Sequence, residues 1–384
     1  MRIVWITRSF LDYRISVFKE LTKLNNGDFY LFYNKKPTPK RVIKKVEEVL
    51  GSNAIGFTTE ISIGNKFFED DFANRSIRIP FQPGLIKRVR HLQPDVIITD
   101  GFFQWTYAAL YLKAFYSIPH LMLYERTKYT ERNAQWYRVA YRKLVLRWID
   151  AIGCSGKLCG EYVESLGFPK EKISFGHMVA DTVGLRNDIK NLDKDKTNFL
   201  RKKLNLSNTV YFYIGQMIPR KGVKELLNAW KTFNNNDATL LLCGDGPYRE
   251  EYEEYCSKNM LKHVKFLGYI PYNLIHEYYA LADVFIIPTI EDNWSLVVSE
   301  AMAIGLPVIS TIYNGCYPEL IRSDNGWVFD PLNELDFVNI LKETYAQRNT
   351  FKEKGLVSSK IVEKFTPKTA AISIFDACKV IYNK

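Results

Sequence analysis

The sequence lacks the long apolar run that a membrane-spanning helix requires. Its apolar stretches, such as Ala282–Pro288, are far shorter than the ~20 residues of such a helix. The apolar start, Met1–Thr7, is followed closely by Arg8 and Asp12, so we expect no signal peptide. Six cysteines are present but form no CxxC pair. This pattern favours reduced thiols in a cytosol over a disulfide framework or a zinc site.

Signatures of nucleic-acid-binding proteins are also missing. The pI of 9.1 and the aromatic content of 14% would suit such a partner. However, the sequence contains no helix-turn-helix, zinc-finger or RNA-binding aromatic motif. No repeat with a period of about 20–50 residues is present either, which argues against a solenoid. We therefore expect no nucleic-acid partner.

All of the excess positive charge lies in the first half of the chain. The net charge is +11: residues 1–190 hold 30 Lys/Arg and 19 Asp/Glu, whereas residues 191–384 hold 23 of each. A basic half is attracted to the phosphates of an anionic membrane surface, a lipid-linked acceptor or a nucleic acid. A basic surface that is merely solvated is the alternative.

Short apolar runs alternate with amphipathic segments along the chain, which predicts an α/β protein with parallel sheets. Because 384 residues exceed the roughly 250–300 that one hydrophobic core supports, we expect two doubly wound domains. The polar, charge-rich stretch around Asp188–Asn208 predicts the boundary. The expected parts are residues 1–185 with 366–384, a linker at 186–208, and residues 209–365.

The segment Pro288–Ile309 reads as a strand end, a polar loop and a helix that begins near Trp294. The backbone N–H groups of Asn293–Val297 would then suit phosphate or sugar oxygens. Asp292 and Glu300 stand eight residues apart and would hold hydroxyls at two ends of an elongated ligand. The alternative is an N-cap acid and a surface glutamate.

Two further strand-to-turn segments carry glycine. In Ile214–Val223, Arg220 and Lys221 would neutralise a diphosphate, or else form an exposed basic turn. The GxxxxGK[ST] spacing of a P-loop is missing. Leu242–Pro247 contains a G-x-G turn without the third glycine of a dinucleotide fingerprint.

Together these segments resemble the C-terminal domain of retaining family 4 glycosyltransferases. The family's G-R-x-x-x-x-K-G, G-x-G-P, F-x-G-x-x and E-G-F-G-L-x-x-x-E-A-M-A-x-G-x-P-V motifs correspond, in order, to Gly215–Gly222, Gly244–Pro247, Phe266–Ile270 and a run ending at Val308. The resemblance is dense over residues 210–330. It implies a GT-B fold of two Rossmann-like domains facing a central cleft, with a helix at Thr369–Tyr382 crossing back to the first domain.

The resemblance also implies residue roles. Lys221 would bind the donor pyrophosphate, Glu300 the ribose, and Asp292 would lie beside the donor sugar. The expected donor-binding set further includes Gly215, Gln216, Arg220, Gly244, Gly268, Tyr269, Ile270, Asn293, Trp294, Ser295, Leu296 and Val297. Gln216 replaces the family's phosphate-binding Arg, and Arg220 would restore the charge. Asp292 replaces a Glu, and Glu291 is the alternative acid.

In the first domain, Glu125 occupies the position at which relatives place a His near the donor sugar. We expect it to be catalytic, orienting sugar hydroxyls or accepting a proton, with Arg126 keeping it ionised. Glu131 would serve the same purpose one turn further on. A salt-bridged loop outside the site is the alternative. Arg14, together with Arg126, is expected to bind the acceptor, although Arg14 also suits an ordinary helix start.

Two helical segments each combine an apolar stripe with basic residues, and we expect different surroundings for the two stripes. In Gln135–Ile149 a stripe that includes Tyr137, Leu144 and Trp148 is interpreted mainly as core. Lys40–Leu50 sets a basic face beside an apolar stripe, which makes it the better candidate for contact with a membrane.

The expected function is retaining transfer of a sugar from a UDP- or GDP-linked donor to a glycan or lipid-linked saccharide, in surface polysaccharide or glycoconjugate synthesis. We expect no metal and no cofactor besides this substrate, because Lys221, Arg220 and a helix dipole would neutralise the leaving diphosphate. The expected location is cytoplasmic, peripheral on the inner face of the membrane. A nucleotide-sugar epimerase of the same fold, or a non-catalytic nucleotide-sugar or nucleic-acid binding protein, is the alternative.

Overall fold

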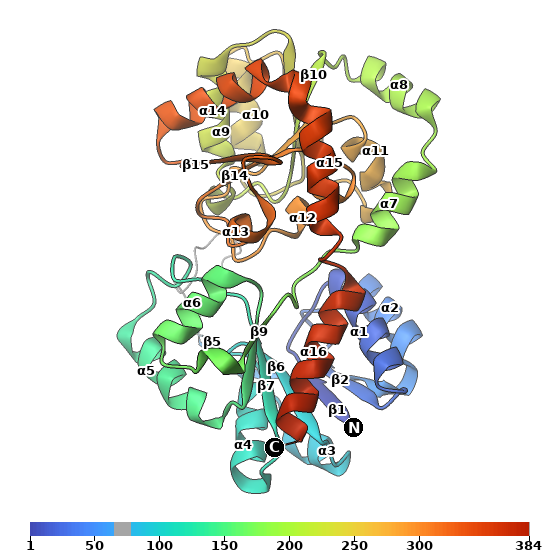
Figure 1. Ribbon diagram of the computed structural model, residues 1–384, viewed down its shortest axis with the longest axis vertical. Coiled ribbons are helices and arrows are strands. Elements are labelled where there is room, and N and C mark those ends of the chain that lie inside the picture. Colours follow the sequence, from blue (N-terminus) through green and yellow to red (C-terminus); the bar gives the residue numbers. More distant parts are fainter. Residues whose placement is uncertain (65–77, 384) are drawn as a thin grey trace. The chain divides into compact units, whose positions relative to one another are not determined.

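The computed structural model describes residues 1–64 and 78–383 and divides the chain into two compact α/β units (Figure 1). Unit 1 comprises Met1–Val179 and Pro367–Lys384, and unit 2 comprises Ala180–Thr366. Each unit contains a parallel sheet flanked by helices, which confirms the predicted fold class.

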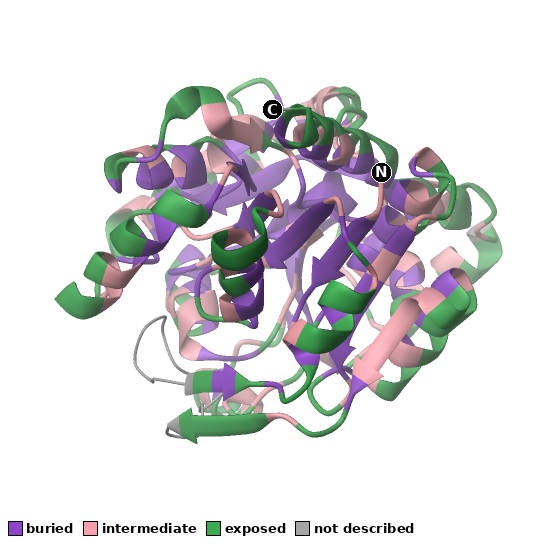
Figure 2. Ribbon diagram, turned by 90° about the horizontal axis from the view of Figure 1, so that it is seen from below, coloured by how far each residue is buried: buried purple, intermediate pink, exposed green. Residues whose placement is uncertain are grey.

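Unit 1 is built on a seven-stranded parallel sheet with the order β3-β2-β1-β6-β7-β8-β9. Its strands are β1 (Ile3–Ile6), β2 (Phe29–Asn34), β3 (Ala54–Phe57), β6 (Val96–Asp100), β7 (His120–Tyr124), β8 (Ala151–Cys154) and β9 (Ile173–Phe175). The central strands are continuous apolar runs because helices cover both faces of the sheet. In Figure 2 these strands are buried, whereas the outer sides of the helices are exposed.

The helices of unit 1 are α1 (Tyr13–Leu24), α2 (Lys40–Leu50), α3 (Leu85–His91), α4 (Thr106–Tyr116), α5 (Trp136–Val145), α6 (Lys157–Ser165) and α16 (Pro367–Tyr382). Short 3-10 turns are η1 (Gly51–Asn53), η2 (Leu146–Trp148) and η3 (Lys170–Lys172). The strands β4 (Ile61–Gly64) and β5 (Arg78–Phe81) form a separate antiparallel pair. The last helix, α16, packs on α1, and Ser373 donates a hydrogen bond to the carbonyl oxygen of Phe175 at 2.7 Å.

Unit 2 holds a six-stranded parallel sheet with the order β12-β11-β10-β13-β14-β15. Its strands are β10 (Thr209–Ile214), β11 (Ala238–Cys243), β12 (Val264–Gly268), β13 (Val284–Ile286), β14 (Val308–Thr311) and β15 (Gly326–Phe329). Its helices are α7 (Thr182–Lys190), α8 (Lys194–Lys203), α9 (Val223–Phe233), α10 (Arg249–Lys258), α11 (Ile275–Tyr279), α12 (Leu296–Ala303), α13 (Tyr317–Leu320), α14 (Glu334–Ala346) and α15 (Phe351–Val362), with 3-10 turns η4 (Pro219–Lys221), η5 (Tyr272–Leu274) and η6 (Arg348–Thr350).

The stretch that was expected to be a linker, residues 186–208, contains the end of α7 and all of α8. Asp181 caps α7 by accepting a hydrogen bond from the Gly184 amide. Within unit 2, Arg186 of α7 donates to the carbonyl oxygens of Ala303 and Ser359 at 2.9 and 2.8 Å. In the charge-rich stretch itself, Arg201 donates to the carbonyl oxygen of Leu281 at 2.8 Å and Lys196 pairs with Glu277 at 2.6 Å, so charged side chains hold these residues on unit 2.

The apolar stripe of α2 is buried in unit 1. Val42 and Val46 are fully buried and Leu50 nearly so. The prediction that this helix presents an apolar face to a membrane is therefore wrong. Its cations remain outside, and two of them, Arg41 and Lys45, pair with Asp12.

Helix α5 is rotated about its axis relative to the prediction, so that a different side of the helix is buried. The stripe interpreted as core is exposed at Tyr137, Leu144 and Trp148, whereas Arg142 is buried. Arg142 lies 2.6 Å from Glu131 in an ion pair with both side chains almost completely buried, and it also donates to the Tyr162 hydroxyl. A buried guanidinium requires an acidic partner, so this pair fixes the rotation of the helix.

We predict that Glu131→Ala lowers the free energy of unfolding of unit 1 by about 3–5 kcal/mol, because it leaves Arg142 buried without its carboxylate. Urea denaturation of the full chain, followed by circular dichroism, measures this change. The matched control is Glu161→Ala, whose pair with Lys157 spans 3.9 Å at the surface and whose loss costs at most about 1 kcal/mol. Equal, small losses for both variants would contradict the role of the buried pair.

Candidate functional site

Loops at the carboxyl edge of the unit 2 sheet are joined to one another by backbone hydrogen bonds. The loop after β10 contacts the loop after β11 through Gly215 N to Cys243 O at 3.0 Å and Met217 N to Asp245 O at 2.9 Å. The loop after β12 joins them through Gly244 N to Gly268 O at 2.9 Å. Ligands of open α/β sheets bind outside this edge. The predicted Gly215, Gly244 and Gly268 thus lie together on these joined loops, which we call the rim.

Two glycines make this close approach possible. Gly222 has a φ of 69°, and a Cβ there would lie 2.0 Å from the Pro288 carbonyl oxygen. Gly244 has a φ of 133°, and its Cβ would lie 1.9 Å from the carbonyl oxygen of Gly215. No other residue fits either position, because both the backbone conformation and the space exclude a side chain.

The Asp292 carboxylate is the centre of the rim. It accepts hydrogen bonds from the Lys221 ammonium at 2.5 Å, the Ser295 hydroxyl at 2.5 Å and the Trp294 amide at 3.3 Å. Burial alone would raise the pKa of Asp292, but Lys221, Ser295 and Arg220 together hold that pKa below its usual value. The structure therefore pairs the predicted pyrophosphate ligand, Lys221, with the predicted sugar ligand, Asp292.

Arg220 lies beside Gln216, as expected if it restores the charge that Gln216 lacks. Its guanidinium donates to the Gln216 side-chain oxygen at 3.4 Å. Its carbonyl oxygen accepts from the amides of Ile290 and Glu291 and from the Thr289 hydroxyl. The loop after β13 is thereby tied to the same rim.

The loop after β13 leads into α12, whose first residues face this rim. Ser295 is the N-cap residue but its hydroxyl donates to Asp292, so no side chain caps the amides at the helix start, including those of Leu296 and Val297. Asn293 Oδ1 and Trp294 Nε1 are buried and have no hydrogen-bond partner among the described residues. Open amides at a helix N-terminus attract anions.

Glu300 is on the buried side of α12, so the alternative of a surface glutamate is wrong. Its carboxylate accepts a hydrogen bond from the Tyr279 hydroxyl at 2.9 Å. Burial raises the pKa of Glu300 to about 6, and the tyrosine hydroxyls that bond to it only partly offset this rise. A buried carboxyl with a raised pKa is a common property of a binding or catalytic site.

The remaining predicted donor residues follow β12. Gly268 ends the strand with a φ of 71°, and the Arg249 guanidinium lies close to its Cα. Tyr269 is largely exposed, and Ile270 follows in the same loop. An exposed aromatic ring at the edge of the sheet offers a stacking surface to a planar base.

Unit 1 gathers a second polar cluster at the carboxyl edge of its own sheet. Arg14 is buried and donates to Glu125 Oε1 at 3.2 Å and to the His177 carbonyl oxygen at 3.1 Å. Burial raises the pKa of Glu125, and the Arg14 guanidinium opposes this rise. Burial and Arg14 together lower the pKa of the His177 imidazole to about 3, so this ring is neutral.

Two details of unit 1 differ from expectation. Arg126 pairs with Glu131 at 3.2 Å, so the cation that hydrogen-bonds to Glu125 is Arg14 and not the flanking arginine. Glu131 is fully buried in its own ion pairs and lies outside the cluster, so the prediction that it serves like Glu125 is wrong. Glu131 lies in the turn that follows β7, where the buried Arg142 draws it into an ion pair.

Asp100 was missed by the sequence reasoning. It ends β6, on the same edge as Glu125, and its presence raises the pKa of that carboxyl. The Trp5 indole donates to Asp100 Oδ2 at 3.2 Å, and Oδ1 is buried without a partner in the described part of the chain. The sequence signal that could have identified Asp100 is an acidic residue at the last position of a buried strand.

The described residues contain no group of three or more His, Cys, Asp and Glu side chains arranged to hold a metal ion. Within residues 1–64 and 78–383, no helix has the length and hydropathy needed to cross a bilayer.

Comparison with known families divides the chain as the structure does. Residues 195–355 match the family Glycosyl transferases group 1, and residues 48–181 match Glycosyltransferase Family 4. The sulfoquinovosyl transferase SQD2 of Arabidopsis thaliana is 24% identical over 85% of this chain and 66% of its own length. An uncharacterized glycosyltransferase of Methanocaldococcus jannaschii, MJ1178, is 23% identical over 73% of this chain and 88% of its own. A second one, MJ1607, is matched over only 36% of its length.

Solved structures share the fold at low identity. Anabaena HepE in complex with UDP and glucose gives a TM-score of 0.72 at 15% identity, covering 99% of both chains. A glycosyltransferase from Rickettsia africae gives 0.74 at 13% identity, covering 99% of this chain and 98% of its own. Both similarities concern the fold, and they confirm the expected GT-B class.

We predict a pH-dependent stability that originates at Glu300. Because the folded-state pKa of about 6 lies above the ordinary value of 4.5 for a glutamate, the protonated carboxyl favours folding. This contribution is complete below about pH 4.5 and is lost as the pH rises through about 6, a change of about 2 kcal/mol. Unfolding measured across this range should show the change in the unliganded chain and not in Glu300→Gln. An identical pH profile for both chains would contradict the assignment.

Proposed function

Since the chain belongs to the glycosyltransferases of group 1 and family 4, we propose that it transfers a sugar from a nucleoside diphosphate sugar to a glycan or lipid-linked saccharide, with retention at the anomeric carbon. The observation that carries this proposal is the convergence of Lys221, Asp292, Glu300 and the open start of α12 on one edge of the unit 2 sheet. These groups match the pyrophosphate, sugar and ribose of such a donor.

The leaving nucleoside diphosphate requires positive charge, and the rim provides it. Lys221 is a point charge next to Asp292, Arg220 stands one residue before it, and the α12 N-terminus adds a partial positive charge. Fixed donors that face the developing charge stabilise the transition state without reorganising. We propose that these groups make the transfer independent of a metal ion, and that no further cofactor takes part.

The ribose hydroxyls are assigned to Glu300. Its carboxylate is buried, accepts the Tyr279 hydroxyl and retains further acceptor capacity for a ribose diol. The carboxylate accepts from two hydroxyl groups only when it is ionised, so donor binding should weaken below about pH 6. The exposed Tyr269 ring is assigned to the base.

Glu125 is assigned to hydroxyl groups of the sugar or acceptor. Arg14 holds it at 3.2 Å, and about a third of its side chain remains exposed. Asp100 lies on the same edge, and one of its oxygens has no partner among the described residues, so two carboxylates of unit 1 would be available to a polyhydroxylated ligand. Arg14 is therefore proposed as a positioning residue, and Arg126, which is engaged by Glu131, as a peripheral acceptor contact.

We infer the class of acceptor from the net charges of the two units. By sequence, unit 1 holds 31 Lys/Arg and 18 Asp/Glu, a net charge of +13, while unit 2 holds 22 and 24, a net charge of −2. A positive unit attracts a phosphate-linked acceptor at an anionic surface. We therefore propose surface polysaccharide or glycoconjugate synthesis at the inner face of the cytoplasmic membrane.

We predict that one nucleotide and its sugars raise the melting temperature of the chain, with UDP the first to test because HepE was crystallised with it. At 100 times its dissociation constant a ligand adds about 2.7 kcal/mol. The rise should be unchanged by EDTA, strongly reduced in Lys221→Ala and Glu300→Gln, and smaller at about pH 5 than at about pH 7.5.

The matched controls replace an acid of unit 1 and an exposed acid of unit 2. Glu125→Gln should retain the nucleotide-dependent rise and lose sugar transfer, while Glu254→Gln, an exposed surface acid of α10, should retain both. Product analysis without acceptor separates transfer from epimerisation. No rise with any nucleotide or nucleotide sugar would overturn the proposed donor site.

A further inference from the structure

The outward face of α5 and η2 carries aromatic and apolar side chains where a solvated helix normally carries polar ones. Trp136 is 81% exposed, Leu144 50%, Tyr137 40% and Trp148 36%. With the exposed Ala140 they follow one side of the helix at the 3.6-residue period. We call these five side chains the α5 stripe. Contiguous apolar surface of this kind marks an interaction site.

The exposure of the α5 stripe is built into the fold. The opposite side of α5 holds Arg142, which is buried against Glu131 at 2.6 Å, and Val145, which packs in the unit 1 core. Burying a guanidinium while leaving a tryptophan in water gains no folding energy over the reverse arrangement. The Arg142–Glu131 pair thus sets the rotation of α5 and leaves the α5 stripe available to a partner.

Cations surround the stripe. Residues 126–148 contain seven Lys/Arg and one Asp/Glu, and that one acid, Glu131, is buried in its ion pairs with Arg126 and Arg142. Lys143 and Arg147 lie on the exposed side, next to Leu144 and Trp148. The surface thus combines aromatic rings, aliphatic groups and the positive charges of Lys143 and Arg147.

We propose that the α5 stripe, flanked by Lys143 and Arg147, is the surface by which unit 1 docks on an anionic lipid bilayer. Tryptophan and tyrosine concentrate at the boundary between headgroups and acyl chains, and interfacial helices combine an apolar face with Lys/Arg. Each cation near an anionic surface strengthens the attraction to it. The inference rests on the proposed function only for the membrane-linked acceptor, and it names the element that reaches the membrane.

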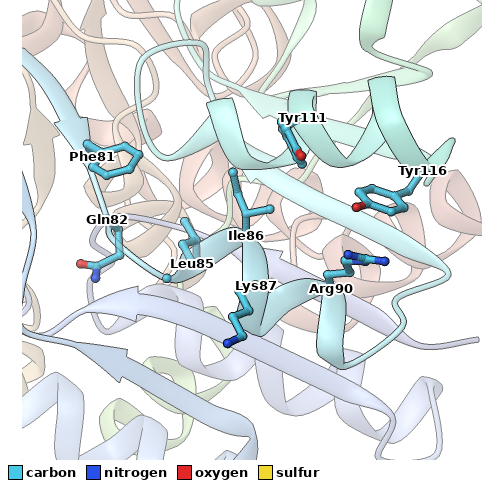
Figure 3. Close-up of a pocket in the computed structure, with 9 residues that line it drawn as sticks. Phe81, Gln82, Leu85, Ile86, Lys87, Arg90, Tyr111 and Tyr116 are labelled. Carbon is cyan, nitrogen blue, oxygen red and sulfur yellow. The ribbon is translucent and has the colours of Figure 1, made fainter.

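Two other surfaces of unit 1 fit a bilayer less well. The apolar stripe of α2 is buried, which leaves only its cations. A pocket of about 470 Å³ lies between α3 and α4, lined by Phe81, Ile86, Lys87, Arg90, Tyr111 and Tyr116 (Figure 3). There the Arg90 guanidinium lies 4.3 Å from the Tyr116 ring centroid, so cation and ring contact each other.

The test is co-sedimentation of the full chain with vesicles of phosphatidylcholine alone or mixed equally with phosphatidylglycerol. We expect binding to the mixed vesicles only. Trp136→Ser/Leu144→Ser should weaken it at least about ten-fold, since the two side chains leave the interface. Lys143→Gln/Arg147→Gln should weaken it about ten-fold as well. All four side chains are exposed, so the variants should fold normally.

Matched controls change equally exposed side chains elsewhere. Phe199→Ser/Leu335→Ser in unit 2 removes two side chains that are 63% and 70% exposed, Phe115→Ser tests the α4 surface, and Lys40→Gln/Lys44→Gln removes two cations of α2. These three variants should bind vesicles like the unchanged chain. Quenching of tryptophan fluorescence by brominated lipid should fall in Trp136→Phe.

Three outcomes would overturn the proposal. The first is that the unchanged chain does not bind mixed vesicles. The second is that the α2 or α4 variants lose binding while the α5 variants keep it. The third is that light scattering shows a dimer, which the α5 variants dissociate. The nucleotide-dependent rise in melting temperature is measured in parallel. Vesicle binding that fails with a normal nucleotide response refutes the docking surface alone, and the converse refutes the donor site alone.

Discussion

The unit 2 rim depends on a single carboxylate, that of Asp292. It holds the Lys221 ammonium, the Ser295 hydroxyl and the Trp294 amide at once, so it connects the turn after β10 with the start of α12. Without a ligand, this pair keeps a partly buried lysine neutralised. A bound diphosphate would compete with Asp292 for Lys221 and leave the carboxylate available to sugar hydroxyls. The same contact thus stabilises the unliganded rim and defines its two binding functions.

Both units use buried charge to set the orientation of their surfaces. In unit 1, Arg14 fixes Glu125 at the sheet edge, and Arg142 with Glu131 fixes the rotation of α5. Such pairs contribute little net stability compared with apolar residues of the same size, but losing one partner is costly. We therefore infer that they are positioning devices: one would present an acid to the proposed ligand, and the other would present the α5 stripe to the proposed membrane.

The sequence was sufficient for the fold and for the residues of the rim. Short apolar runs form strands, such as Ile3–Ile6 and His120–Tyr124, and the ordered motifs place Lys221, Asp292 and Glu300 in one unit. The rotation of helices could not be predicted, because α2 and α5 both combine an apolar stripe with cations. Which side is buried depends on partners distant in sequence or on a lone acid such as Glu131. Likewise, adjacency favoured Arg126 as the partner of Glu125, whereas Arg14, 111 positions away, forms the contact.

The most direct test of the central claim is a calorimetric titration of UDP, or of whichever nucleoside diphosphate stabilises the chain, into Asp292→Asn. Asparagine keeps one acceptor oxygen, which serves either the Trp294 amide or the Ser295 hydroxyl, and removes the charge that competes for Lys221. We predict that the diphosphate binds about ten-fold more tightly, a gain of about 1.4 kcal/mol, while sugar transfer falls. Binding that is weakened as much as in Lys221→Ala would show that Asp292 supports the pyrophosphate site instead of competing for it, and would contradict this account.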